Sequence, residues 1–302
     1  MPKPTLIVIT GATATGKTAL AIRLAQHFDT EILSADSRQF YRELTIGTAK
    51  PTTEQLQRVK HHFINTLTLD QDYNISRYEK EALECLDQLF LKKNVAILCG
   101  GSGLYIQAIC RGMDPLPESD PELRKQLSEL LDTEGITALQ KKLQELDPDF
   151  FSLVDHSNPH RMIRAIEVCM LTGKKYSGMR KGETVERNFR IVKIGLDVER
   201  GPLYANINTR VNKMMEEGLE EEARKVYPLK HLNSLNTVGY KELFDYFDGK
   251  TDLETATTLI RQNTRNYAKR QLTWFRRDPE IKWFDPTQEA DMIAFLEQRL
   301  QG

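Results

Sequence analysis

The sequence has few of the features that mark a specialised class of protein. Its 302 residues include four cysteines and no CxxC pair, so neither a disulfide framework nor a zinc site is indicated. Charge of one sign is not in excess either, because 42 Lys and Arg oppose 43 Asp and Glu. No apolar run approaches the roughly 18 residues of a membrane span. We therefore expect a globular, cytoplasmic monomer without a membrane partner, in which any affinity for nucleic acid comes from local basic patches.

The first motif present is "GATATGKT" at residues 11–18, between the apolar run "LIVIT" and the segment "KTALAIRLAQHF". This order is typical of a strand, a phosphate loop and an amphipathic helix. Gly11 and Gly16 let backbone N–H groups turn inward, Lys17 adds a point charge, and Thr18 offers a hydroxyl to Mg²⁺. A di- or triphosphate site with Mg²⁺ as cofactor is predicted. Its residues are Gly11, Ala12, Thr13, Ala14, Thr15, Gly16, Lys17 and Thr18.

The rest of the sequence predicts the fold that surrounds this loop. Strand-like runs at 31–35, 95–99 and 190–198 are separated by helical stretches, one of them at about 76–91. Such alternation predicts an α/β fold, a P-loop NTPase-like parallel sheet flanked by helices, with ligands at the carboxyl ends of its strands. The proline-rich "DPLPESDPE" interrupts the pattern. We predict a core of residues 1–117 and 186–302, with helices alone after residue 198, and a mainly helical inserted domain at 118–185.

Taken alone, the phosphate loop favours an ATPase or a kinase. However, the strand at 95–99 ends in Cys99 and then "GGS", where many P-loop NTPases have an acid that holds Mg²⁺. The acid at a strand end near the loop is Asp36, in "SADSRQFY". It could face a substrate or cap the N-terminus of a helix, and its local sequence leaves both open.

Several longer motifs are more specific than the loop. They are "SADSRQFYRELTIGTAKPT", "HHFI", "CGGSGLYIQAI", "GMDPLP", "NPHRMIRAIEVCMLTG", "VGYKEL" and "TRNYAKRQLTWFRR". In this order they resemble the bacterial tRNA dimethylallyltransferases, also called tRNA isopentenyltransferases, over nearly the whole chain. The resemblance implies transfer of a dimethylallyl group from dimethylallyl diphosphate to N6 of the adenosine at position 37, just 3′ of the tRNA anticodon. The loop would then hold the diphosphate of a prenyl donor.

The resemblance also implies catalytic roles. Asp36 would be the general base for N6, and Lys17 would bind the leaving diphosphate together with Thr18 and Mg²⁺. Ser102 could donate a hydrogen bond to a phosphate oxygen, and Arg210 matches a family arginine that reaches the diphosphate. Without the resemblance, Arg210 is better interpreted as a solvated helix residue. The sequence departs from the family at Ala12, usually Pro, at Asn65, usually Asp, and at Ser102, usually Thr.

Basic residues indicate where RNA could lie. Arg261, Arg265 and Lys269 recur every four residues on one predicted helix face, although such faces are usually just solvated. The insert has basic residues that could clamp the anticodon stem, and the target adenosine must leave its stack to reach Asp36. The expected tRNA-binding residues are Asp36, Ser37, Arg38, Gln39, Ser102, Arg124, Arg161, Lys174, Lys175, Arg265, Lys269 and Arg270.

Three alternatives remain open at this stage. An adenylate isopentenyltransferase would share the phosphate loop, but a free nucleotide needs neither the basic insert nor the basic helix. A P-loop small-molecule kinase is disfavoured by the missing acid after residues 95–99. A noncatalytic RNA-binding module would have little use for Lys17 together with Asp36.

Overall fold

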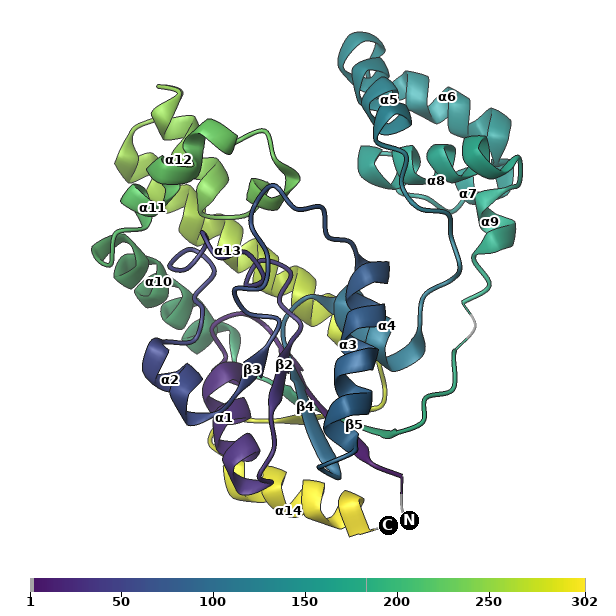
Figure 1. Cartoon of the computed structure of the whole chain (residues 1–302). Coiled ribbons are helices and arrows are strands. Elements are labelled where there is room, and N and C mark those ends of the chain that lie inside the picture. Colours follow the sequence, from purple (N-terminus) through teal and green to yellow (C-terminus); the bar gives the residue numbers. More distant parts are fainter. Residues whose placement is uncertain (1–2, 183, 302) are drawn as a thin grey trace. The chain divides into compact units, whose positions relative to one another are not determined.

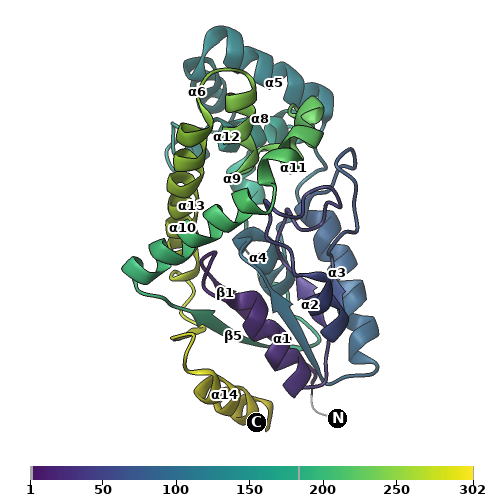
Figure 2. The same cartoon turned by 90° about the vertical axis from the view of Figure 1, so that its left-hand side faces the viewer.

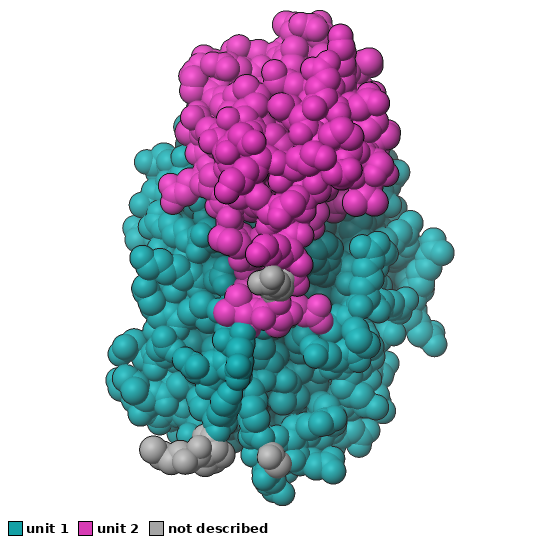
Figure 3. All heavy atoms as spheres, turned by 90° about the vertical axis from the view of Figure 1, so that its right-hand side faces the viewer, with its two compact units in different colours: residues 1–110, 186–302 teal, residues 111–185 magenta. Residues whose placement is uncertain are grey.

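The computed structural model describes residues 3–182 and 184–301. It divides into two compact units, residues 1–110 with 186–302 and residues 111–185, which are coloured separately in Figure 3. The larger unit contains a six-stranded sheet in the order β3-β2-β4-β1-β5-β6, and all neighbouring strands are parallel. The predicted α/β fold is confirmed.

The strands follow the apolar runs of the sequence. They are β1 (Thr5–Gly11), β2 (Ile32–Ser34), β3 (His61–His62), β4 (Val95–Cys99), β5 (Arg190–Leu196) and β6 (Ile281–Phe284). The strands predicted at 31–35, 95–99 and 190–198 are all present. The expectation of helices alone after residue 198 is wrong, because β6 adds an edge strand beside β5. With four residues, and Ile281 and Phe284 as its buried positions, β6 is too short to show a strand period.

Helices cover both faces of this sheet (Figures 1 and 2). Side chains of β1 alternate, so Ile7 and Ile9 share a core with α1 (Lys17–His27) and α14 (Glu289–Gln301). Leu6 and Val8 point to the opposite core, which includes side chains of α3 (Ile75–Phe90) and α4 (Gly103–Arg111). Burial on both faces explains why these strands read as continuous apolar runs.

The remaining helices of the larger unit follow β5, apart from the short α2 (Thr53–Arg58). They are α10 (Arg200–Glu216), α11 (Leu219–Val226), α12 (Tyr240–Phe247) and α13 (Leu253–Phe275). The Asp252 carboxylate caps α13 by accepting the Thr255 N–H at 2.7 Å. Figures 1 and 2 show α10 alongside α13, and the two helices are in contact. This pair later supplies two side chains to the site.

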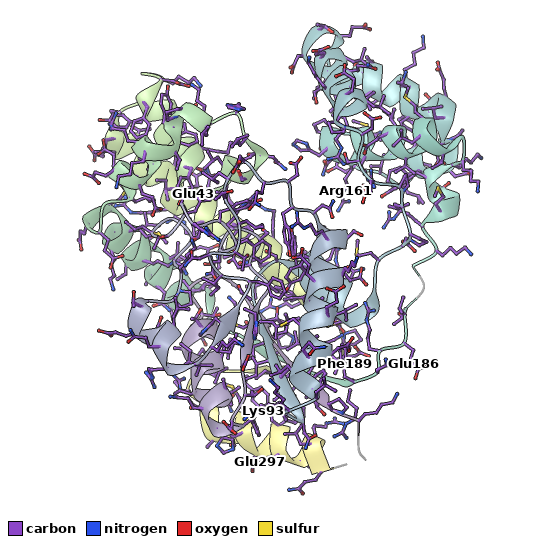
Figure 4. The ribbon with its side chains drawn as sticks, in the orientation of Figure 1. Glu43, Lys93, Arg161, Glu186, Phe189 and Glu297 are labelled. Atoms are coloured by element: carbon purple, nitrogen blue, oxygen red, sulfur yellow. The ribbon has the colours of Figure 1, made fainter. Side chains whose placement is uncertain are left out.

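Two residues labelled in Figure 4, Lys93 and Glu297, lie at the amino edge of the sheet. Lys93, which precedes β4, pairs there with Asp29 at 2.5 Å. Glu297 of α14 bonds His27 at the C-terminal end of α1 at 2.9 Å. These two contacts tie helices and loops together at the amino edge, whereas ligand sites of parallel α/β sheets are expected at the carboxyl edge.

The smaller unit is helical, and its residues other than 183 include no strand. Its helices are α5 (Pro121–Glu134), α6 (Ile136–Leu146), α7 (Pro148–Phe151), α8 (Pro159–Thr172) and α9 (Tyr176–Met179). Leu127, Leu139, Leu143 and Met162 form a core of its own. This unit begins at Arg111, whereas the sequence interpretation placed the start of the insert at 118. Among all described residues, no helix is long and apolar enough to cross a membrane.

Candidate active site

The phosphate loop joins β1 to α1 in a tightly turned conformation. Gly11 has φ +135°, and a Cβ there would lie 2.7 Å from the Leu196 carbonyl oxygen. Gly16 has φ +90° and no side chain to cap α1, so the first N–H groups of that helix are available to an anion. Lys17 Nζ donates to the Ala12 carbonyl at 2.5 Å, and Thr15 Oγ1 donates to the same oxygen at 2.9 Å. The loop is therefore preformed for phosphate.

The Lys17 ammonium lies in a poorly solvated place. Burial lowers its pKa to about 8, and the nearby Arg210 guanidinium acts in the same direction, while Cys99 and Asp36 oppose the shift. Two cations held close together in a partly dry cavity favour a ligand with several negative charges. A diphosphate meets that requirement.

Asp36 follows β2 in a turn, and no helix begins at this residue. Its Oδ1 accepts the Arg38 N–H at 3.0 Å, which is an Asx turn and not the helix cap considered from the sequence. Its own N–H lies 3.4 Å from Ser34 Oγ. The turn fixes one carboxylate oxygen, and the described residues give the other no hydrogen-bond donor. Asp36 is thus oriented while keeping an oxygen available to a substrate.

The turn after β4 packs against the Asp36 segment. A Cβ on Gly100 would lie 2.3 Å from the Ala35 carbonyl oxygen, so this close approach requires glycine. Ser102 Oγ accepts the Ser37 N–H at 3.1 Å and donates to Ser37 Oγ at 3.3 Å. The hydroxyl is therefore next to Ser37, one residue from Asp36. Its predicted contact with the diphosphate stays a prediction.

One cavity of the larger unit is lined by most of the residues predicted for chemistry, although Ser102 is not part of its lining. Lys17, Thr18, Asp36 and Arg210 all line it, as does Gln39. Gln39 is buried and donates to the carbonyls of Thr48 and Ala49, at 3.2 and 3.4 Å, which holds the wall of the cavity in place. Three separate stretches of sequence therefore contribute predicted residues to one space. The apolar part of its lining includes Ala21, Ile32, Ala49, Pro51, Ile64 and Cys99.

Arg210 of α10 and Tyr267 of α13 close the cavity. Burial lowers the Arg210 pKa while the Asp36 carboxylate acts to raise it, so Arg210 is not the solvated helix residue that its local sequence suggested. Burial also raises the pKa of Tyr267 to about 12, with a further contribution from Asp36. Tyr267 therefore enters the site as a neutral phenol. The sequence analysis saw it only as an aromatic residue among basic ones.

His61 of β3 is a further wall residue that the sequence analysis did not single out. Its Nδ1 lies 2.8 Å from the Val59 carbonyl oxygen, and since a carbonyl only accepts, Nδ1 carries the proton. Nε2 is buried and has no hydrogen-bond partner among the described residues. Burial lowers the His61 pKa. The cavity therefore contains a neutral imidazole with a bare acceptor nitrogen, and the motif "HHFI" was the signal for it.

The basic face of α13 packs against α10. Arg261 bonds Asn212, and Arg265 bonds Asn208 at 2.7 Å. Around the Tyr204 ring lie the charged groups of Arg200, Arg265 and Lys269, at 5.2, 5.8 and 6.0 Å from its centroid. Within the described residues none of these three cations pairs with a carboxylate. Tyr204 packs against the apolar cluster that includes Ala12, so this cation cluster lies near the phosphate loop.

The basic residues predicted in the smaller unit differ in their surroundings. Arg124 donates two hydrogen bonds to Glu167, at 3.0 and 3.1 Å, and that carboxylate is wholly buried. Lys175 pairs with Asp149 at 2.8 Å. Arg161 and Lys174 are exposed, and Arg161 is labelled on α8 in Figure 4. Arg124 therefore holds α5 to α8, whereas Arg161 and Lys174 form no ion pair with a carboxylate of the described residues.

The donor groups of the site suit Mg²⁺. Thr18 places a hydroxyl at the start of α1, and Asp36 adds a carboxylate to the same cavity. No cluster of three or more His, Cys, Asp or Glu residues that could hold a metal occurs among the described residues. Mg²⁺ is commonly held by one or two protein groups together with phosphate oxygens, so this sparse set fits it better than a metal that needs a full protein cage.

The fold and the cavity define a P-loop protein in which a phosphate loop and a carboxylate line one cavity. The family of IPP transferases matches residues 39–278. The chain belongs to this family, the tRNA dimethylallyltransferases, which confirms the resemblance read from the motifs.

Curated relatives and solved structures match almost the full chain. It is 54% identical to tRNA dimethylallyltransferase of Christiangramia forsetii, over 98% of both chains. It is 50% identical to tRNA dimethylallyltransferase 1 of Bacteroides fragilis, over 100% of both. The tRNA isopentenylpyrophosphate transferase of Bacillus halodurans superposes with a TM-score of 0.73 at 35% identity, over 99% of this chain and 97% of that one. A eukaryotic dimethylallyltransferase acting on tRNA gives 0.79 at 25% identity, over 98% and 77%.

Proposed function

We propose that this protein transfers the dimethylallyl group of dimethylallyl diphosphate to N6 of adenosine 37 in tRNA and releases diphosphate. The observation that carries the proposal is the single cavity in which Asp36 lies with Lys17 and Arg210 beside a preformed phosphate loop. A diphosphate leaving group and a proton-losing nucleophile need these two kinds of group side by side. Membership of the tRNA dimethylallyltransferase family supports the same substrates.

The residues fit an in-line substitution at the allylic carbon. The carbon–oxygen bond breaks and its electron pair leaves with the diphosphate, whose growing charge is balanced by Lys17, Arg210 and the N–H groups at the start of α1. Adenine N6 supplies the electron pair of the new carbon–nitrogen bond. It is a poor nucleophile because its lone pair is delocalised into the ring. The free oxygen of Asp36 therefore accepts the N6 proton as the bond forms.

We further propose Mg²⁺ as the cofactor, held by the Thr18 hydroxyl and by oxygens of the diphosphate. When bound, the ion supplies positive charge that neutralises the leaving diphosphate. The chain's own contribution is to orient the donor. Thr15 and Lys17 hold the Ala12 carbonyl, and this fixes the curvature of the loop before any ligand arrives.

The proposed partner is the anticodon stem-loop of tRNA. The cluster of Arg200, Arg265 and Lys269 around Tyr204 supports it, because cations with only neutral partners favour a phosphate backbone. We propose that the protein acts as a monomer. Since tRNA is decoded in the cytoplasm, we propose that the protein acts there.

The proposal is tested by incubating the protein with unmodified tRNA, labelled dimethylallyl diphosphate and Mg²⁺ in the absence of ATP. Label is expected in the tRNA. Free adenosine monophosphate replaces tRNA in a parallel reaction, and γ-labelled ATP replaces the prenyl donor in another. Label that enters only the free nucleotide, or transfer that strictly requires ATP hydrolysis, would overturn the proposal in favour of an adenylate isopentenyltransferase or a kinase.

A further inference from the structure

We infer that Gln271 of α13 is a positioning residue for the prenyl transfer. It joins the phosphate loop to the turn after β4 and so holds the diphosphate-binding groups in register with the Asp36 segment. The inference rests on the proposed function.

Gln271 bridges two backbone segments at the centre of the site. Its side chain is buried, with 6% of its surface exposed, and it lines the cavity. The Thr13 N–H donates to Gln271 Oε1 at 2.8 Å. Gln271 Nε2 donates to the Gly101 carbonyl oxygen at 3.0 Å. One amide thus satisfies a donor of the phosphate loop and an acceptor of the turn that precedes Ser102.

The chemistry of this bridge is specific to an amide. It needs an acceptor and a donor on one short side chain, and neither partner can change its own role because both are backbone groups. An ionised carboxylate could accept from Thr13 but could not donate to Gly101, and it would place a negative charge beside the diphosphate. A leucine would leave both backbone groups buried without a partner.

The glycines of the turn allow it to pack closely against α13. A Cβ on Gly101 would lie 2.2 Å from Gln271 Nε2, and one on Gly103 would lie 2.3 Å from Trp274 Nε1. The motifs "CGGSG" and "RQLTWF", which are 170 residues apart at the Gln271 to Gly101 bond, are therefore two halves of one contact. This close approach leaves little freedom for the turn to slide along the helix.

Further hydrogen bonds link this turn to the residues on either side of Asp36. The Ser102 N–H donates to the Ala35 carbonyl at 3.2 Å, and Ser102 Oγ bonds Ser37 on the other side of Asp36. A continuous set of hydrogen bonds therefore runs from Thr13 through Gln271 and the turn to the residues that flank Asp36. Tyr267, one helical turn before Gln271, lines the same cavity. Helix α13 thus sets the donor loop and the base against each other.

The test compares Gln271→Leu and Gln271→Glu with Gln262→Leu, a matched change at an exposed position of the same helix. Four quantities are measured: the affinity for inorganic diphosphate with Mg²⁺ by calorimetry, the affinity for tRNA, the single-turnover rate of prenyl transfer to tRNA, and the thermal unfolding midpoint. Gln271→Leu should lower the transfer rate about tenfold or more, as expected from orphaned buried backbone groups. Its tRNA affinity should be unchanged, and Gln262→Leu should match the parent in all respects.

Gln271→Glu provides a signature that a purely structural role would not give. Its diphosphate affinity should be lowest at alkaline pH and should approach the parent value as the pH falls, because a protonated carboxyl donates and accepts like the amide. Each value is divided by the parent value at the same pH, which removes the common titration of Lys17, Asp36, Arg210, Tyr267, Cys99 and His61 around the cavity. Gln271→Leu should show no such recovery.

Two outcomes are distinguished. If the folded Gln271→Leu and Gln271→Glu variants bind diphosphate and transfer the prenyl group as the parent does, the bridge is ordinary helix packing and the inference is wrong. If the parent binds diphosphate but modifies no tRNA, the proposed function fails, whereas the affinity series still decides whether Gln271 positions the loop.

Discussion

At the scale of single residues, Asp36 is the group on which the proposed chemistry depends most. Asp36→Asn keeps the size of the side chain, and its amide oxygen can still accept the Arg38 N–H, so the Asx turn should survive. Loss of the general base should lower the single-turnover rate by about 100-fold or more. Binding of both substrates should be retained, and Asp72→Asn, a change at an exposed acid, serves as the control. A near-normal single-turnover rate in Asp36→Asn would mean that Asp36 has only a structural role.

Lys17 gives the site a defined pH dependence. Its ammonium has a pKa of about 8 in the free protein, and a bound diphosphate stabilises the charged form. Affinity for diphosphate should therefore weaken as the pH rises above 8, and binding in that range should take up a proton. Calorimetry in buffers of different ionisation enthalpy measures this uptake. A Lys17→Met variant that keeps the same uptake and pH profile would show that another group is responsible.

The same pKa has a consequence for stability. Because the folded-state pKa of about 8 is below the ordinary value of 10.5, the unfolded chain binds the Lys17 proton more tightly. The contribution of Lys17 to the free energy of unfolding should therefore rise with pH between about 8 and 10.5. Lys17→Met should lack this rise.

Ser102 replaces the threonine usual in the family, and its hydroxyl is assigned to the leaving diphosphate by that resemblance. Ser102→Ala should slow transfer by about 10- to 1000-fold, by analogy with the loss of one oxyanion donor, and Ser102→Thr should be tolerated. Since Ser102 Oγ also bonds Ser37, Ser37→Ala is the control that removes the hydroxyl partner alone. An alanine variant as fast as the parent would limit residue 102 to its backbone role in the turn.

Site residues could be predicted where a short sequence motif contains them, and not where distant segments bring them together. Lys17 and Thr18 belong to one loop with fixed spacing, so the local pattern was enough to place them at the phosphate loop. Asp36 stands at the end of a strand, and its local sequence left a helix cap as an equal alternative. Gln271 and Tyr267 reach the cavity from a helix far along the chain, and their roles depend on how α13 packs on the turn after β4. No local pattern reports such packing, although the glycines of that turn do mark a close approach.

At the scale of elements, α13 combines a buried face with the cation cluster. Arg265→Gln with Lys269→Gln should weaken tRNA binding and flatten its salt dependence by up to about one logarithmic unit for each phosphate that is no longer neutralised. The control is Arg58→Gln with Lys93→Gln, which removes the same charge from other parts of the surface. The measurement is tRNA affinity at several salt concentrations. A salt slope equal to that of the parent would mean that these cations serve only the packing of α13 on α10.

The strands that escaped sequence interpretation are the two at the edges of the sheet. The strands at the centre of the sheet are buried on both faces and read as apolar runs, which made them visible. β3 has two residues and β6 has four, and each pairs along one side only, at an edge of the sheet. The helical stripe of Arg261, Arg265 and Lys269 was predicted correctly as a shared face, but periodicity could not show that this face meets α10.

At the scale of the whole molecule, the smaller unit is the part whose role is least tied to chemistry. Replacing Arg161, Lys174 and Lys175 together by Gln should weaken tRNA binding and reduce its salt dependence, since their energy would come from counterion release. Affinity for dimethylallyl diphosphate should not change, because the cavity is lined by residues of the larger unit alone. If the salt dependence of tRNA affinity is unaltered in a folded variant, the tRNA clamp must instead be assigned to Arg270 and the cation cluster beside α13.

The division of the chain was visible in the sequence because composition and periodicity both change where the insert begins. The proline-rich stretch marked the change, yet the compact unit starts at Arg111, before those prolines. Extended segments carry no periodic signal, so the pattern could place the first helix of the insert but not the residue at which the chain leaves the core.

The central claim, prenyl transfer to one adenosine of tRNA, is tested most directly by mapping the product. Unmodified tRNA is treated with the protein, dimethylallyl diphosphate and Mg²⁺ without ATP, digested with a nuclease, and the fragments are analysed by mass spectrometry. We predict one added dimethylallyl group, at N6 of the adenosine just 3′ of the anticodon, with its appearance lost in Asp36→Asn. A modification at any other nucleotide, or tRNA left unchanged by a protein that binds both substrates, would contradict the account.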